Sequence, residues 1–169
     1  GKKNIVLKNN LSSGKINAVS HANRKDFWVV TPKGNSDTIF AYLLTSSGIS
    51  NTPVISRTGY KLKQSRYTDT TLGYFKLSPD GKKLCNINWL DSSIIADFDA
   101  STGKISNVWG FKLNYISGIG LEFSAKSKFL YIFDYIKNRL SQFDLSAKTK
   151  SEFLASRTTA DSGNVATGS

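Results

Sequence analysis

The chain has 169 residues, 39% of them hydrophobic and 12% aromatic, which is the composition of a folded globular protein rather than of a disordered chain. No apolar run approaches the roughly 20 residues that a membrane-spanning helix needs, and the start has no apolar signal-peptide core, so we expect any targeting segment to be removed or never present. Lys and Arg number 23 against 12 Asp and Glu, a net charge of +11. This balance favours an anionic partner, although the lysines are scattered and many fall in turns, where solvated charge is expected.

Short hydrophobic runs, rich in aromatic and β-branched residues and bounded by Gly, Asn, Asp or Ser, follow one another along the chain. They predict strands at residues 27–30, 38–44, 84–89, 93–98, 129–133 and 140–145. No window has a convincing 3.6-residue apolar period, so no helix is predicted. The sequence therefore indicates an all-β chain.

A unit of strands and polar turns recurs three times. Its copies are residues 18–28, 39–43 and 46–48, then 75–84, 94–99 and 101–104, and finally 121–131 and 140–145. Ser20, Ser78 and Ser124 mark equivalent places, which puts His21 at the position of Pro79. The interval between the first two copies is longer and includes an insertion at residues 57–70. Repeats of this length and kind are typical of β-propeller blades.

The turns have a clear physical logic. Pro79 fixes φ, Asp80 can bond its own backbone and Gly81 accepts positive φ. Residues 101–103, Ser-Thr-Gly, have the same role in the next hairpin. The aromatic residues of the repeat are expected to fill the layers between blades: Phe75, Phe98, Phe123, Tyr131 and Phe143.

These patterns predict an all-β fold, a partial β-propeller of about three to four antiparallel blades. Residues 1–150 hold the blades, at about 15–56, 70–110 and 115–150, and residues 151–169 form a polar linker or the start of a truncated blade. A closed ring commonly needs four to eight blades. We therefore expect the remaining blades of a longer chain, or a second copy, to cover the open edges.

Residues 15–30 and 40–49 resemble the N-terminal propeller region of large surface proteins of Bacteroidetes. Those proteins carry a gliding-motility-associated C-terminal sorting domain and are exported by the type IX secretion system. Later stretches, residues 77–84, 98–107, 120–124 and 130–131, look like the next two blades of that family. The Ser-Pro-Asp-Gly turns are shared with many WD-repeat-like propellers. The resemblance implies a secreted or cell-surface protein and assigns no activity to this region; the sorting domain is absent from the chain.

Two residue types that often carry chemistry occur once each. His21 is the only histidine and Cys85 the only cysteine, too few for a common zinc site. Cys85 cannot form an internal disulfide. We interpret His21 as a turn residue and Cys85 as a small strand residue.

Carboxylates recur near strand ends at Asp97, Asp99, Asp134 and Asp144. A close pair could perform acid–base chemistry or hold Ca²⁺, but Asp99 and Asp144 occupy equivalent places in two copies, as turn-capping side chains do. Residues 118–120, Gly-Ile-Gly, open no phosphate-binding helix, and there is no Gly-x-Ser-x-Gly elbow. We therefore predict no catalytic residue, no metal site and no cofactor.

The face opposite the Ser-containing turns is the predicted ligand-binding surface. Aromatic rings beside polar side chains suit stacking on sugars or bases, or anchoring of a peptide. For Trp89 and Trp109, packing between blades is the alternative. The candidate ligand-binding residues are Lys61, Lys63, Arg66, Tyr67, Trp89, Asp91, Trp109, Tyr115, Tyr135, Lys137 and Asn138.

The function predicted from these features is a non-catalytic recognition or scaffold module of a secreted or cell-surface bacterial protein, which binds protein or glycan through one propeller face. Two alternatives stay open. The chain could be part of a propeller enzyme acting on polysaccharide, or a salt-sensitive binder of anionic polymers. Nucleic acid is not expected as a partner.

Overall fold

The computed structural model describes residues 13–61, 73–88, 93–112, 118–134 and 137–162. Their strands form three antiparallel sheets, which we call blades 1, 2 and 3. Blade 1 contains β1 (Asn17–Ser20), β2 (Phe27–Pro32), β3 (Thr38–Thr45), β4 (Gly48–Ile49) and β5 (Val54–Arg57). Blade 2 contains β6 (Phe75–Leu77), β7 (Lys83–Asn86), β8 (Ser93–Asp99) and β9 (Lys104–Phe111). Blade 3 contains β10 (Gly118–Phe123), β11 (Phe129–Asp134), β12 (Arg139–Asp144) and β13 (Thr158–Ser162), with helix α1 (Lys150–Ala155) between its last two strands.

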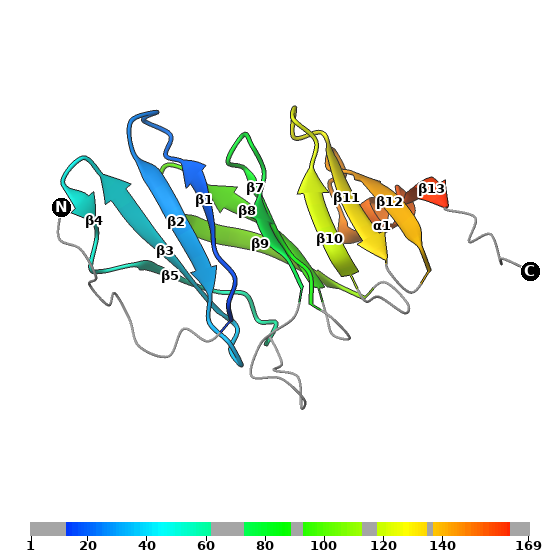
Figure 1. Ribbon diagram of the computed structural model, residues 1–169, viewed down its shortest axis with the longest axis horizontal. Helices are drawn as coiled ribbons and strands as arrows, with labels where there is room; N and C mark the ends of the chain where they lie inside the picture. The colour runs from blue at the N-terminus through cyan, green and yellow to red at the C-terminus, as the bar shows by residue number, and fades with distance from the viewer. Residues whose placement is uncertain (1–12, 62–72, 89–92, 113–117, 135–136, 163–169) are drawn as a thin grey trace, which may run out of the picture.

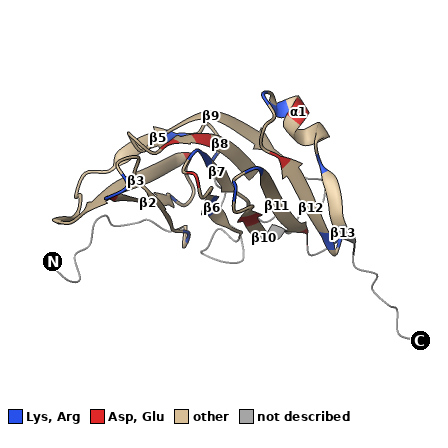
Figure 2. Cartoon of the chain, turned by 90° about the horizontal axis from the view of Figure 1, so that it is seen from above, with Lys and Arg blue, Asp and Glu red and all other residues tan. Residues whose placement is uncertain are grey.

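The three blades stand side by side as an arc (Figure 1). The first strands of the blades are neighbours, β1 beside β6 and β6 beside β10, and they form the concave side of the arc. The last strands, β5 and β9, lie on the convex side (Figure 2). The protein is therefore a partial β-propeller, as the sequence predicts.

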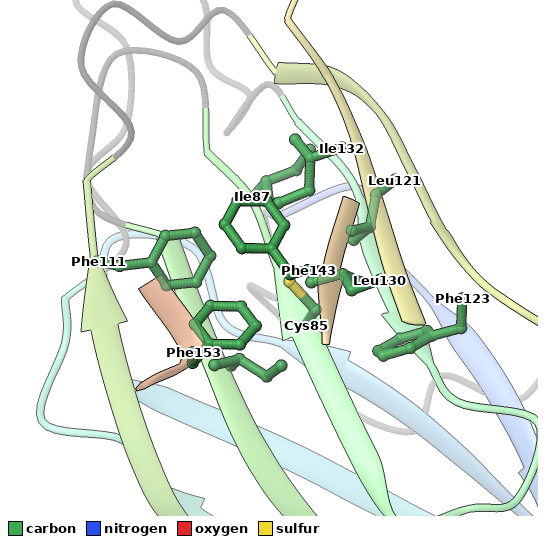
Figure 3. Close-up of a cluster of buried hydrophobic side chains, with 10 residues drawn as sticks. Cys85, Ile87, Phe111, Leu121, Phe123, Leu130, Ile132, Phe143 and Phe153 are labelled. Carbon is green, nitrogen blue, oxygen red and sulfur yellow. The ribbon is translucent and has the colours of Figure 1, made fainter. Parts of the chain in front are cut away.

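Two apolar layers hold the blades together. The layer between blades 1 and 2 consists of Val19, Trp28, Val30, Ile39, Ala41, Phe75, Leu77, Leu84, Ile94 and Phe98. The layer between blades 2 and 3 consists of Cys85, Ile87, Ile95, Phe111, Leu121, Phe123, Leu130, Ile132, Phe143 and Phe153 (Figure 3). The expected burial of Phe75, Phe98, Phe123 and Phe143 is confirmed, whereas Tyr131 is only half-buried.

The repeat alignment predicted for blade 1 is wrong by one residue. The backbone N–H of Ser78 donates to the carbonyl of Lys83, and His21 N–H closes the same six-residue turn by donating to the carbonyl of Asp26, each at 2.9 Å. Ser124 N–H makes the equivalent bond to Phe129 at 2.9 Å. His21, rather than Ser20, is therefore the counterpart of the two serines.

The side chains at this turn position explain the mismatch. Ser78 Oγ accepts from the backbone N–H of Lys83 at 2.8 Å, and His21 Nδ1 accepts from the backbone N–H of Asn23 at 3.0 Å. In blade 1 the equivalent N–H groups, those of Lys25 and Asp26, donate to Asn23 Oδ1 at 2.9 and 3.0 Å, so an amide oxygen two residues further on replaces the hydroxyl as the acceptor inside the turn. Because strand side chains alternate between faces, the corrected alignment places Phe27 on the face that Leu84 occupies in blade 2.

Residues 150–162 form α1 and β13 rather than a linker. Thr149 caps α1 by accepting a hydrogen bond from the backbone N–H of Glu152 at 3.2 Å. Phe153 is buried, with its ring stacked 5.0 Å from that of Phe143, and β13 completes blade 3 by pairing with β12. A helix of six residues is too short to show an apolar period, which is why the sequence did not predict it. Blade 3 therefore extends to Ser162.

Candidate functional site

The propeller has two unlike faces. One carries the tight turns at residues 21–26, 78–83, 99–103 and 124–129. We call the other face the loop face. There β7 and β11 end and β8 and β12 begin. Buried polar side chains gather at the loop face in two places, one between blades 1 and 2 and one in blade 3.

The first place is a cage around the Lys15 ammonium, just before β1. Lys15 Nζ donates to Asn86 Oδ1 at 2.9 Å, to the Ile87 carbonyl at 2.9 Å and to Asn88 Oδ1 at 2.6 Å. The side chain is buried, and this burial lowers the pKa of Lys15 to about 7. Because all three ammonium protons are engaged, Lys15 fastens blade 1 to blade 2 rather than offering a free amine.

The second place contains Asp134, the last residue of β11. Its side chain is 2% exposed, and its Oδ1 accepts from the backbone N–H of Lys137 at 3.2 Å. Oδ2 is buried and has no hydrogen-bond partner in the part of the chain that the structure describes. Leaving a buried carboxylate oxygen unpaired is costly, and folded proteins do so mainly where an ion, a water or a ligand completes the site.

Two arginines stand beside this carboxylate. Arg139 is the cross-strand partner of Asp134, so both side chains emerge on one face of blade 3. Arg157 Nε donates to Ser141 Oγ at 3.1 Å. Burial and, second, the charge of Arg139 lower the pKa of Arg157, while Asp134 acts in the opposite direction. These four residues, Asp134, Arg139, Ser141 and Arg157, form a group that we call the Asp134 cluster. It combines one carboxylate and one hydroxyl with two guanidinium groups.

Within the described ranges, the Nε of Arg139 is also buried without a hydrogen-bond partner. The cluster therefore presents an unpaired acceptor and an unpaired donor on the same sheet face. Such a combination can take a proton at one point and stabilise negative charge at another. Among the described residues, no group of three His, Cys, Asp or Glu side chains is close enough together to hold a metal ion.

Two of the carboxylates that recur near strand ends bond to the turns that follow them. Asp99 accepts bonds from the hydroxyl groups of Ser101 at 2.6 Å and Thr102 at 2.7 Å, which lowers the pKa of Asp99 to about 2. Asp144 accepts from the backbone N–H of Ser146 at 2.8 Å. The predicted capping role of these two carboxylates is confirmed. Cys85 is a buried free thiol whose pKa burial raises.

Four of the candidate ligand-binding residues lie in the described ranges. Trp109, on β9, packs against the layer between blades 2 and 3, with its ring 6.3 Å from that of Phe153 and Lys83 Nζ 5.6 Å from its centroid. Lys61 is exposed beyond β5, and Lys137 and Asn138 lie in the turn after Asp134. The other predicted residues lie outside the described ranges: Lys63, Arg66, Tyr67, Trp89, Asp91, Tyr115 and Tyr135.

No protein-family model matches the chain, and no curated protein matches it in sequence. Its fold is nevertheless that of solved β-propellers. A candidate 6-phosphogluconolactonase of Bacteroides fragilis is 18% identical with a TM-score of 0.57, over 89% of this chain and 39% of that one. A candidate 6-phosphogluconolactonase of Bacteroides uniformis is 15% identical with a TM-score of 0.53, over 89% and 42%.

The periplasmic gluconolactonase of Pseudomonas aeruginosa is 16% identical with a TM-score of 0.51, over 79% of this chain and 36% of that one. The chain thus spans about two fifths of the length of these proteins. At such low identity the likeness establishes the β-propeller fold alone.

These neighbours correct two predictions. The resemblance to surface proteins of the type IX secretion system is wrong, because the structural neighbours are lactonase-type propellers. Its Ser-Pro-Asp-Gly motifs follow from turn geometry that many propellers need. The predicted non-catalytic recognition or scaffold module is contradicted as well, since these proteins are described as lactonases. None of the three is described as a polysaccharide enzyme or as a binder of anionic polymers.

Proposed function

We propose that this propeller hydrolyses a sugar lactone and that the Asp134 cluster (Asp134, Arg139, Ser141 and Arg157) forms part of its active site. The observation that carries the proposal is the buried, unpartnered Oδ2 of Asp134 beside two guanidinium groups. The lactonase descriptions of three propellers of the same fold support the choice of reaction.

A base that activates water and a cation that stabilises the oxyanion both accelerate the hydrolysis of a lactone. In the proposed step, Asp134 Oδ2 accepts a proton from water as the water oxygen bonds to the lactone carbonyl carbon. The carbonyl π electrons move to oxygen, and an arginine stabilises the resulting oxyanion. When this intermediate collapses, the ring C–O bond breaks and the departing oxygen takes the proton from Asp134. The product is a hydroxy acid, which ionises and releases one proton to solvent.

The neighbouring turn would help to orient the catalytic carboxylate and the substrate. The backbone N–H of Lys137 donates to Asp134 Oδ1, which leaves Oδ2 as the oxygen that faces the reaction. We propose Lys137 and Asn138, which follow in the same turn, as substrate contacts. The net positive charge of the cluster suits a substrate that carries a phosphate or becomes a carboxylate.

The test is an assay of proton release by the protein in its longest natural form. Glucono-δ-lactone and its 6-phosphate are each followed with a pH indicator in weak buffer, and the spontaneous rate is subtracted. The proposal expects enzyme-dependent hydrolysis of at least one of them, in proportion to protein concentration. No acceleration of either substrate would overturn it.

We further propose that additional propeller blades, or a second copy of this chain, cover the open face of blade 1. Leu84 and Leu130 follow the tight turns of blades 2 and 3 and are 0% exposed, because the preceding blade covers them. Phe27 occupies the same position in blade 1 and is 46% exposed. Because the residue at this position is buried in the other two blades, we expect another protein surface to cover Phe27 in the whole protein.

We also propose that the protein is exported. The support is that one structural neighbour is described as a periplasmic protein. In the described residues, no helix is long and apolar enough to cross a membrane. Detection of the protein in the periplasmic or culture fraction, with a cytoplasmic marker absent there, would test the proposal. Retention with that marker would contradict it.

A further inference from the structure

The end of β7 surrounds a single nitrogen cation with oxygen atoms. Lys15 Nζ contacts Asn86 Oδ1, the Ile87 carbonyl and Asn88 Oδ1 at 2.6–2.9 Å. We propose that this cage is a binding site for a monovalent cation of the size of ammonium or potassium, and that Lys15 occupies it as a tethered cation. The proposal is independent of the lactonase function.

The cage offers only oxygen acceptors to the nitrogen at its centre, which suits a cation better than a group that both donates and accepts hydrogen bonds. A lysine ammonium has three N–H donors and its own carbon as the fourth substituent, and each donor here has one oxygen acceptor. None of the three acceptors is charged, and none of the ion pairs formed among the described residues includes Lys15. Neutral carbonyl-type oxygens that replace a hydration shell are what selective sites for monovalent cations use.

The orientation of the Asn86 amide supports the same conclusion. Asn86 is 0% exposed and turns its Oδ1 toward Lys15, while its buried Nδ2 has no hydrogen-bond partner in the described part of the chain. An amide that had to satisfy only protein groups would gain by pairing its donors. The cation therefore determines which way this side chain points.

The cage belongs to blade 2 and the tether to blade 1. The carbonyl of Lys15 accepts from Thr31 Oγ1 at 2.8 Å, and its backbone N–H donates to Ser13 Oγ at 3.3 Å, so the start of the side chain is fixed in blade 1. The cage oxygens lie at the end of β7 and just beyond it. Shortening the side chain would therefore leave three buried acceptors around an open space that a free cation could enter.

The experiment is best done at a pH where the lysine is charged. Burial lowers the pKa of Lys15 to about 7, and Cys85, the titratable group whose interaction with it is resolved, stays a neutral thiol because burial raises its pKa. At pH 6 the wild-type cage therefore holds an ammonium.

The test compares thermal unfolding of the wild type and Lys15→Ala at pH 6 in ammonium, potassium and choline chloride of equal ionic strength. We expect ammonium or potassium to raise the Tm of Lys15→Ala in a saturable way, by about 3–6 °C at ten times the dissociation constant. Choline, which is too large, should have no such effect. The wild type, whose cage is filled, should not distinguish the three salts.

Two matched variants complete the design. Lys15→Met keeps the space of the lysine side chain filled with an uncharged chain, so its Tm should not depend on which of the three cations is present. Lys76→Ala removes a lysine that pairs with Glu122 outside the cage, and its Tm should likewise not depend on the cation. If Lys15→Ala does not fold in choline, the readout becomes the yield of refolded protein, which ammonium should restore. Equal behaviour of Lys15→Ala in all three salts, by Tm or by refolding yield, would overturn the proposal.

Discussion

Asp134 and Arg139 face each other across the β11–β12 pair, yet Oδ2 of the aspartate and Nε of the arginine both lack a hydrogen-bond partner among the described residues. Two opposite charges at paired positions normally use each other to offset the cost of burial. Here one polar atom of each side chain has no hydrogen-bond partner among the described residues at the loop face of blade 3. This arrangement is expected of a site that a substrate or an attacking water completes.

Replacement of Arg157 tests the cationic side of the cluster. Arg157→Gln removes a charge that would stabilise the oxyanion, so kcat/KM for lactone hydrolysis should fall about 100-fold, with most of the loss in kcat. Arg157→Lys should retain more activity because it keeps the charge. Arg24→Gln, an exposed change on the tight-turn face, is the control. Wild-type kcat in Arg157→Gln would remove this residue from the proposed site.

Truncation of Phe153 tests whether α1 belongs to the core. The ring stacks on Phe143 at 5.0 Å and meets Phe111 edge-on at 5.5 Å. Phe153→Ala should lower the free energy of unfolding by about 3–5 kcal/mol, measured by urea titration. The same truncation at Phe27, which is 46% exposed, should cost much less. Equal losses in the two variants would mean that α1 does not stabilise blade 3.

The buried lysine gives stability a defined pH dependence. The pKa of Lys15 is about 7 in the folded protein against 10.5 as the ordinary value, so between these limits the unfolded chain binds more protons. Stability should therefore rise with pH from 7 to 10, by at most about 1.4 kcal/mol per pH unit. The measurement is urea unfolding of wild type and Lys15→Met across this range.

In that comparison, Lys15→Met should lack the rise, because the variant has no group to titrate at this position. Below pH 7 the charge is present in both folded and unfolded states, so the difference between the two proteins should level off. Parallel pH profiles from pH 6 to 10 would contradict the lowered pKa.

Light scattering over a range of concentrations tests the open face of blade 1. If further blades or a second copy cover Phe27, the 169-residue chain alone should dimerise or aggregate as its concentration rises. Phe27→Ser should weaken that association, while Ile16→Ser, a change at a residue that is also exposed but lies before β1, should not. A strictly monomeric chain at every concentration would argue against coverage of this face.

The blades were predictable because strands and tight turns are determined by residues that lie close together in the sequence. Alternating strands and turn formers such as Pro79, Asp80 and Gly81 act over a few residues, and the strand positions follow from them. The one-residue error in blade 1 arose because no serine stands at the position of His21, and Asn23 Oδ1 accepts the backbone bonds that a serine hydroxyl accepts in the other two turns. That substitution concerns hydrogen-bonding function, which residue similarity does not reveal.

The sites were harder to predict because their members are distant in sequence. Asp134, Arg139 and Arg157 come together only through the pairing of β11, β12 and β13, and Arg157 stands in a segment expected to be a linker. Lys15 and Asn86, which form a hydrogen bond, are 71 residues apart in the sequence. The one visible signal was Asp134, a carboxylate at the end of the third blade's apolar strand, for which the sequence pattern predicts no catalytic role.

The proposed base offers the most direct test of the account. We would compare lactone hydrolysis by the wild type and by Asp134→Asn, with Asp80→Asn on the opposite face as the matched control. If Asp134 takes the proton from water, kcat should fall at least about 100-fold in Asp134→Asn, while Asp80→Asn keeps wild-type activity. Undiminished hydrolysis by a folded Asp134→Asn protein would contradict the assignment of this cluster as the active site.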